Sequence, residues 1–155
     1  MGRLRNYVVL PIAIAERDGS AELQLNEYEQ SSSLLAPDEA GMKSWVTEQR
    51  FKVVGSVTVP TMRLDMFINA VGLRSIDFLK VDAQGLDLEV VRSAGDRLTD
   101  VARVQLEATT VSYRQYEGAP GKSLIVDFME SNGFRLRREE VQSHGQEANL
   151  TFIRT

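Results

Sequence analysis

The segment from residue 76 to residue 107 constrains the fold most strongly. A short apolar run, Ile76 to Val81, is followed from Gly85 onward by apolar residues at helical spacing, and Val101 to Glu107 follows as a second strand. The apolar positions of the expected helix are Leu86, Val90, Val91, Ala94 and Leu98. A strand, a helix and a strand in this order require parallel strands joined by a right-handed crossover. The segment therefore predicts an α/β fold.

The N-terminal part of the chain predicts strands and a long polar loop. Residues 7–15 form a continuous apolar, β-branched run before Asp18-Gly19, as in a strand buried on both faces. Pro11 favours an edge or a bulge there, because proline donates no hydrogen bond. The alternation over residues 21–25 predicts a second strand, and the two together suggest a hairpin. Residues 29–50 are polar and without period, and they predict a surface loop.

The remaining elements follow from the same kind of pattern. They are a strand at 53–59, a helix capped by Thr61 and ended by Gly72, a helix at 123–132 closed by Gly133, and strands at 134–137 and 148–154. The polar stretch 139–147 suits an antiparallel connection. We found no repeat and no linker that would divide the chain, so we expect one domain over residues 1–155.

Composition narrows the range of partners and cofactors. The net charge is -4, so no broad positive field exists to attract nucleic acid or an anionic membrane. The chain has no cysteine, which excludes disulfides and cysteine metal ligands and fits a reducing cytoplasm. The single histidine, His144, is expected in a solvated loop, so we expect no metal site. The apolar stretch near the N-terminus is too short and too interrupted for a signal sequence or a membrane span.

The sequence IDFLKVDAQGLDLEVV at residues 76–91 resembles the signature of FkbM-type S-adenosylmethionine-dependent methyltransferases. That signature runs roughly I-D-x-L-K-I-D-x-[EQ]-G-x-[ED]-L-x-V-L. Further similar segments, in order, are PIAIA at 11–15, DG at 18–19, SSL at 32–34, LDMFI at 64–68, VQLE at 104–107, YEG at 116–118, NGF at 132–134 and LTFIR at 150–154. The resemblance covers nearly the whole chain but only the C-terminal half of the family domain.

This resemblance implies a partial Rossmann-like methyltransferase fold, with a mixed sheet and flanking helices. This chain would lack the first two strands of the family fold, so residues 7–15 would correspond to the third strand of that fold. The domain is thus expected to be truncated at its N-terminal side. The sequence contains no G-x-G, which is the form of the glycine-rich turn that begins the family's cofactor site.

Three polar residues are candidates for the chemistry. Ligands of open α/β sheets bind outside the carboxyl ends of the strands, and Asp82, Gln84 and Glu107 lie just past the two expected strands. Methyl transfer to a hydroxyl group needs a base to take the proton, which Asp82 or Glu107 could supply. Gln84 does not titrate, but its amide can orient an acceptor. The alternative interpretation of Asp82 is that it caps the helix that follows.

The resemblance adds further candidates. It implies that Lys80 and Tyr116 contact the acceptor and that Ala13 and Ile14 contact S-adenosylmethionine. The alternatives are a Lys80 side chain that extends to the rim of the sheet and a Tyr116 ring folded over the edge of the core.

Two functions follow as expectations. The first is O-methylation of a hydroxylated small molecule or sugar in the cytoplasm, with S-adenosylmethionine as cofactor. The second is a non-catalytic remnant or interaction module that no longer binds the cofactor. Because the two absent strands would leave backbone groups unpaired, we also expect a rearranged sheet or a homodimer through an exposed strand edge.

Overall fold

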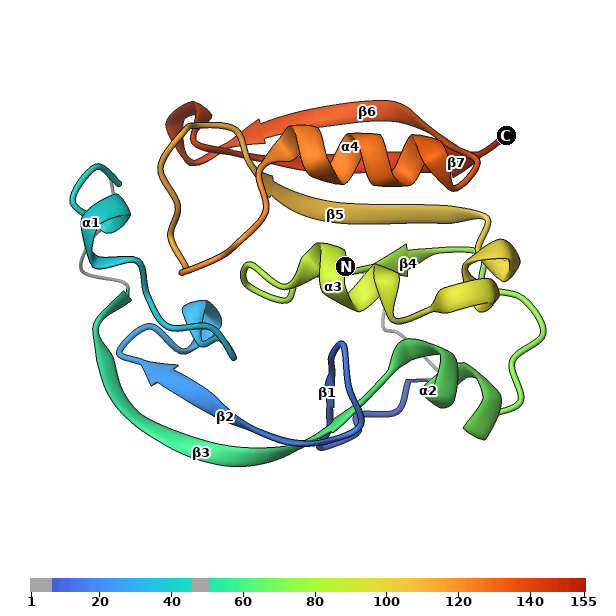
Figure 1. Ribbon diagram of the computed structural model, residues 1–155, viewed down its shortest axis with the longest axis horizontal. Coiled ribbons are helices and arrows are strands. Elements are labelled where there is room, and N and C mark those ends of the chain that lie inside the picture. Colours follow the sequence, from blue (N-terminus) through green and yellow to red (C-terminus); the bar gives the residue numbers. More distant parts are fainter. Residues whose placement is uncertain (1–6, 46–50) are drawn as a thin grey trace.

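The computed structural model describes residues 7–45 and 51–155, and its strands form two sheets (Figure 1). The elements are β1 (Ala13–Ile14), β2 (Gly19–Asn26), η1 (Glu29–Ser31), α1 (Glu39–Met42), β3 (Val53–Met62), α2 (Leu64–Ala70), β4 (Leu79–Lys80), α3 (Asp87–Arg92), η3 (Gly95–Asp100), β5 (Arg103–Thr109), α4 (Lys122–Ser131), β6 (Phe134–Gln142), η4 (Ser143–Gly145) and β7 (Glu147–Arg154), where η marks a short 3-10 helix. One sheet has the order β1-β3-β2, and the other has the order β4-β5-β7-β6. The predicted α/β class with a mixed sheet is confirmed.

The four-stranded sheet contains the predicted strand–helix–strand unit. β4 and β5 are parallel, with Leu79 opposite Val104, and a further parallel bridge joins Ile76 to Val101. α3 and η3 connect the two strands. β7 then pairs antiparallel with both β5 and β6. Parallel pairing brings the carboxyl ends of β4 and β5 to the same edge of the sheet.

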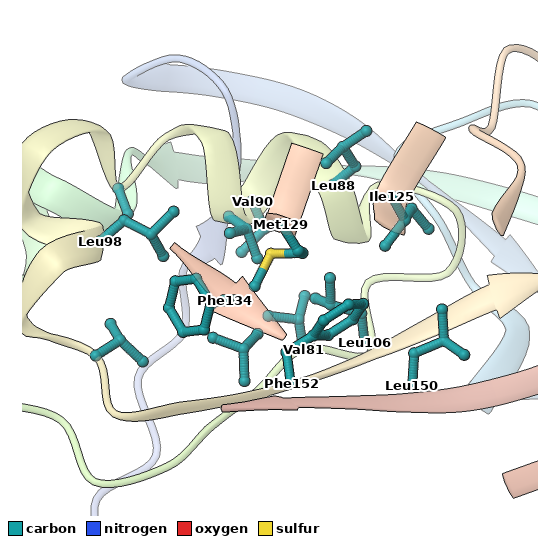
Figure 2. Close-up of a cluster of buried hydrophobic side chains, with 14 of the residues drawn as sticks. Val81, Leu88, Val90, Leu98, Leu106, Ile125, Met129, Phe134, Leu150 and Phe152 are labelled. Carbon is teal, nitrogen blue, oxygen red and sulfur yellow. The ribbon is translucent and has the colours of Figure 1, made fainter. Parts of the chain in front are cut away.

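The hydrophobic core fills one face of this sheet. Val104, Leu106 and Ala108 alternate along β5 and are at most 2% exposed, whereas Gln105 and Glu107 between them lie on the other face. Figure 2 shows Leu106 and other strand residues packed with side chains from α3 and α4. Each fully buried side chain of this kind contributes about 1.5–3 kcal/mol to folding. The polar face of β5 is thereby left for the candidate site.

The helical pattern after Gly85 is interrupted. The predicted helix over 86–98 consists of α3 and η3, and the break lies at Gly95, whose φ is +51°. Glycine adopts this left-handed conformation without steric cost. The apolar positions of both pieces are still buried, including Val91 at 0% and Leu98 at 4% exposed. The burial pattern was therefore predicted correctly and the continuity of the helix was not.

The N-terminal prediction was wrong in two respects. Only Ala13 and Ile14 of the expected strand 7–15 are in β1, and Tyr7, Val8 and Val9 are 72–83% exposed. The expected hairpin does not form, because β3 lies between β1 and β2. β3 is ten residues long and pairs along the whole of β2, so the backbone groups of β2 on that side are already used.

The helix α2 starts later than predicted. Thr61 lies in β3, and the residue before the helix is Arg63, whose side chain makes no capping hydrogen bond. The first two N–H groups of the helix bond to Ser93 instead: Leu64 N donates to Ser93 Oγ at 2.9 Å, and Asp65 N donates to the Ser93 carbonyl at 3.1 Å. The predicted end at Gly72 is confirmed by its φ of +69°.

The C-terminal elements are largely as predicted. β6 and β7 are antiparallel, but β6 continues to Gln142, so much of the polar stretch 139–147 is strand and only η4 connects the two. η1 and α1 lie within the predicted loop 29–50, of which positions 46–50 are outside the described residues. In the described part of the chain, no helix is long and apolar enough to span a membrane.

Candidate functional site

The turn at residues 82–85 lies after β4 and has an unusual backbone. Gln84 and Gly85 have φ values of +49° and +96°, in the left-handed region. A Cβ atom added to Gly85 would lie 3.0 Å from Tyr116 Cδ2 and 3.3 Å from Ala119 Cβ. Glycine is thus required at position 85 both by its conformation and by the close approach of the tyrosine ring.

Asp87 ties this turn to β5. Its side chain is 2% exposed, and its two carboxylate oxygens accept hydrogen bonds from Ala83 N at 3.3 Å and Glu107 N at 3.0 Å. Burial raises the pKa of Asp87 to about 6, although the backbone N–H groups act in the opposite direction. We assigned Asp87 no role from the sequence. The sequence signal for it was a single acidic residue at the start of an apolar helical pattern.

Asp82 faces solvent at the same turn. Its Oδ2 accepts a hydrogen bond from Lys80 Nζ at 2.7 Å, and its Oδ1 accepts one from Gln84 Nε2 at 2.8 Å. Partial burial acts to raise the pKa of Asp82, but these two hydrogen bonds hold it below its ordinary value. The hydrogen bond to Asp82 in turn raises the pKa of Lys80. The alternative that Asp82 caps α3 is wrong, because Leu86 occupies the cap position and no side chain caps it.

Tyr116 lies under the turn and holds it in place. The ring is 1% exposed, and Oη is 2.8 Å from both Gln84 Oε1 and the Ser31 carbonyl oxygen, so its single proton is shared between two acceptors. Ser33 Oγ donates a 2.7 Å hydrogen bond to the Gln84 carbonyl oxygen. Burial raises the pKa of Tyr116 well above its ordinary value. The hydroxyl group is therefore protonated and engaged within the protein.

Two cavities meet at this turn, and Asp82 and Gln84 line both of them. The first, which we call the apolar cavity, has a volume of about 310 Å³ and lies between β1 and β4. Its walls are mostly aliphatic, and they include Ala13 and Ile14 on one side and Lys80 on the other.

The second, which we call the polar cavity, has a volume of about 540 Å³. Its wall is almost entirely polar, apart from the rings of Phe51 and Tyr28. Glu107 and Glu147 line it from neighbouring strands, and Gln115 lines it from the loop after β5.

Glu107 is the most perturbed carboxylate that lines a cavity. Burial, followed by the negative charges of Glu147, Asp82 and Asp87, raises its pKa to about 8, and Lys80 offsets this only in part. Among the described residues, none donates a hydrogen bond to its carboxylate. We had expected Glu107 to lie just past the end of its strand, but it lies within β5.

Glu147 was missed by the sequence interpretation. It lies one position before the strand predicted at 148–154, is 9% exposed, and accepts a 2.5 Å hydrogen bond from Ser143 Oγ. In the antiparallel ladder Thr109 is opposite Glu147 and Glu107 is opposite Asn149, so the two glutamates are diagonal neighbours on one face. The alternation of the last strand was the only sequence signal for this placement.

The structure thus groups the predicted site residues in three places. The apolar cavity holds Ala13, Ile14, Lys80, Asp82 and Gln84, the polar cavity holds Asp82, Gln84 and Glu107, and Tyr116 lies below the turn. Their roles in binding and catalysis stay predictions. Over residues 7–45 and 51–155, no three acidic or histidine side chains are grouped so that they could hold a metal ion.

A comparison with protein families defines the class. The model of the methyltransferase FkbM domain matches residues 3–136, and the chain belongs to this family. A relative is the 2-O-methyltransferase NoeI of Sinorhizobium fredii, which is 28% identical over 139 residues, covering 84% of this chain and 54% of NoeI. The chain therefore spans about half the length of that relative. No solved structure gives a significant match. Family and relative support a methyltransferase-like function, and the family implies use of S-adenosylmethionine in general.

The fit of Gly85 can be tested by substitution. We expect Gly85→Ala to lower the free energy of unfolding by about 2–4 kcal/mol, because left-handed strain and contact with Tyr116 add together. Gly118→Ala is the matched control, since Gly118 has a φ of +74° with no atom within 4 Å of an added Cβ. It should cost only about 1 kcal/mol. Urea denaturation measures the free energy of unfolding of both variants. Equal losses in the two variants would contradict the close packing of Gly85 against Tyr116.

The raised pKa of Glu107 predicts a pH-dependent stability. The unfolded chain releases this proton near pH 4.5, whereas the folded protein retains it up to about pH 8. Stability is therefore lost as pH rises between these values. Glu107→Gln should show a melting temperature that increases relative to wild type from pH 5 to pH 8 and then changes no further. Glu117→Gln, at an exposed position, controls for the loss of a carboxylate, and a pH-independent difference for Glu107→Gln would refute the assignment.

Proposed function

We propose that this chain carries the catalytic part of an S-adenosylmethionine-dependent O-methyltransferase that acts on a hydroxyl group of a small molecule or sugar. One observation carries the proposal: an apolar cavity and a polar cavity share Asp82 and Gln84. A methyl donor and a hydroxylated acceptor need different surroundings but must meet within contact distance. The parallel β4–β5 pair joined by α3, with its cavities near the strand ends, supports a Rossmann-like arrangement.

The residues of the apolar cavity fit the chemistry of the cofactor. Aliphatic side chains, Ala13 and Ile14 among them, offer a surface for the adenine ring, and Lys80 and Asp82 form an ion pair that complements a zwitterionic amino acid group. S-adenosylmethionine, when bound, supplies an electrophilic methyl group. Asp82 is well suited to bind positive charge, because its lowered pKa keeps it ionised at neutral pH.

Glu107 is better suited than Asp82 to act as the base. A general base is most effective when its pKa is near the working pH, and that of Glu107 is about 8. Glu107 would take the proton that the acceptor hydroxyl loses when the methyl group leaves the sulfur of the donor for the acceptor oxygen. Asp82 is half-exposed and already accepts two hydrogen bonds, so it has less capacity to take a proton. The two carboxylates would thus have different roles.

The second candidate function is a non-catalytic interaction module. It is favoured by exposed apolar side chains on β3, where Val53, Val54 and Val57 are 41–62% exposed, and by the exposed residues Tyr7 to Val9. Apolar surface of this kind commonly marks a site of protein association. The two functions differ in whether the apolar cavity binds the cofactor.

Calorimetric titration with S-adenosylmethionine distinguishes them. We expect binding in the micromolar range, weakened at least about tenfold in Asp82→Asn, because the variant loses the charge that would face the ammonium group. Asp77→Asn is the matched control, since Asp77 is exposed on the same segment and lines neither cavity. Absence of binding at millimolar ligand would reject catalysis by this chain and support the interaction module.

We propose that the protein acts on a small molecule or sugar in the cytoplasm, and that it binds neither nucleic acid nor a membrane. The net charge of -4 disfavours nucleic acid, and the absence of cysteine is compatible with a reducing compartment.

We further propose a homodimer through the outer edge of β4 in the absence of cofactor. Within the described chain, β4 is an end strand of its sheet. Val81 N donates to the Gln105 carbonyl on β5, so the N–H of Lys80 points to the open edge. Unpaired edges of this kind are templates for strand addition. A second copy there would border Leu79 and Lys80, which also line the apolar cavity, so excess S-adenosylmethionine should favour the monomer.

Light scattering after size exclusion tests this proposal. We expect about twice the chain mass of 17.3 kDa for the ligand-free protein. Lys80→Pro should give the monomer, because proline removes the outward N–H without removing a hydrogen bond to β5. Lys80→Ala keeps that N–H and should remain dimeric. A monomeric wild-type protein, or a dimer that persists in Lys80→Pro, would reject pairing at this edge.

A further inference from the structure

The four-stranded sheet has an outer face, which α3 and α4 leave uncovered because both helices pack against the core on the other face (Figure 2). In the first half of β5, the residues on this outer face are Arg103 and Gln105. Arg103 is opposite Ile153 of β7, and Gln105 is opposite Thr151, so the outer face continues in register from strand to strand. It contains a cavity of about 290 Å³, which we call the basic pocket. Three arginines line this pocket, namely Arg103, Arg137 and Arg138.

A β-bulge in β6 directs two consecutive arginines to this pocket. Leu136 is opposite Phe152 and Arg138 is opposite Thr151, so Arg137 is an extra residue without a counterpart on β7. In a regular strand, neighbouring side chains point to opposite faces of the sheet. The extra residue interrupts this alternation, and Arg137 and Arg138 both line the basic pocket. Bulges that re-aim a side chain in this way are over-represented near functional sites.

The basic pocket has an excess of positive charge. The only carboxylate among its lining residues is that of Glu140, which forms an ion pair with Arg138, with Nη2 of the arginine 3.0 Å from Oε1 of the glutamate. Within residues 7–45 and 51–155, neither Arg103 nor Arg137 has an acidic partner. Two guanidinium charges are therefore uncompensated in the pocket. This local excess contrasts with the net charge of -4 on the whole chain.

Phe78 restrains one of these arginines and adds an apolar surface. The guanidinium carbon of Arg103 lies 5.0 Å from the centroid of the Phe78 ring, in a cation–π contact. A planar guanidinium group that is already held in place loses less conformational freedom when it binds an anion. The ring of Phe78 is 45% exposed, so it remains accessible to a ligand, and Ile153 lines the same pocket. The pocket thus combines fixed charge with apolar surface.

A phosphate monoester matches the basic pocket better than a carboxylate does. Such an ester carries about two negative charges near neutral pH and has three acceptor oxygens, whereas a carboxylate carries one charge and has two oxygens. The guanidinium group binds phosphate oxygens in pairs, with geometric specificity. The two uncompensated charges of the pocket therefore balance one phosphate group. A volume of about 290 Å³ suits a small molecule.

We propose that the basic pocket is a second ligand site, which binds the phosphate group of a small phosphate monoester through Arg103, Arg137 and Arg138, with the organic part of the ester against Phe78. This inference goes beyond the proposed function, because the basic pocket shares no lining residue with the apolar cavity or the polar cavity. Its affinity for the ester should therefore be the same with and without S-adenosylmethionine.

The experiment uses the whole chain and two probes of similar shape but different charge. Phenyl phosphate is a dianion at the pH of the measurement, and phenyl sulfate is a monoanion. Binding is measured by two-dimensional NMR titration at pH 7.5 and constant ionic strength. We expect phenyl phosphate to bind with a Kd in the millimolar range or below, and phenyl sulfate to bind at least about tenfold more weakly. The backbone amide signals of Gln105 and Arg138 should shift, and those of the turn at residues 82–85 should not.

Variants test the assigned residues. Arg137→Gln and Arg103→Gln should each weaken the binding of phenyl phosphate at least about fivefold, because each removes a charged donor. Arg17→Gln is the matched control, since Arg17 is exposed, lies before β2 and does not line the pocket. The NMR spectrum of each variant reports whether it is folded. An unchanged affinity in folded Arg137→Gln would overturn the proposal, as would equal affinity for phenyl phosphate and phenyl sulfate.

Two further measurements identify the source of the phosphate group and separate this site from the proposed methyl-transfer site. Cosedimentation with vesicles that contain phosphatidic acid, without any response to phenyl phosphate, would replace the soluble ester by a lipid and overturn the proposal. Displacement of phenyl phosphate by S-adenosylmethionine would place the ester in the cofactor cavity and also overturn it. Binding of phenyl phosphate by a chain that fails to bind S-adenosylmethionine would support the basic pocket while rejecting the methyltransferase.

Discussion

Asp87 fixes the geometry on which the candidate site depends. Its buried carboxylate accepts the N–H of Ala83, in the turn after β4, and the N–H of Glu107, on β5. A single side chain thus joins the turn after β4 to β5 beside the two cavities. Burying a carboxylate is costly unless it is hydrogen-bonded. Burial raises the pKa of Asp87 to about 6, the negative charge of Asp82 adds to this, and the backbone N–H groups offset it only in part.

The other carboxylates of the site differ because of their surroundings. Asp82 is half-exposed beside a lysine and has a lowered pKa, whereas Glu107 is more deeply buried beside other acids and has a raised pKa. The apolar cavity therefore has an anionic group at its rim, and the polar cavity has a carboxyl group that titrates near neutral pH. Gly85 makes this division possible, since only glycine allows the turn between them to pass so close to Tyr116.

Most of the site's backbone could be predicted from the sequence. The parallel unit around α3, the glycine turn and the positions of Asp82 and Gln84 followed from local periodicity and from the family signature, whereas Glu107 was expected past the end of its strand and lies within β5. The N-terminal hairpin could not, because the partner of β2 is β3, more than 25 residues further along the chain. Local pattern indicates that a segment is a strand, but the choice of neighbour depends on packing against residues distant in sequence.

The sequence by itself determined the family, the α/β class and which side chains face the core, because these depend on residue spacing along single elements. Only the tertiary structure decided that Glu147 lies beside Glu107, that Asp87 joins the turn after β4 to β5, and that the Tyr116 hydroxyl is engaged within the protein. The first of these depends on the register of β7 against β5, since a shift of a single residue would turn the side chains of a strand to the opposite face, and the other two depend on how segments distant in sequence pack together.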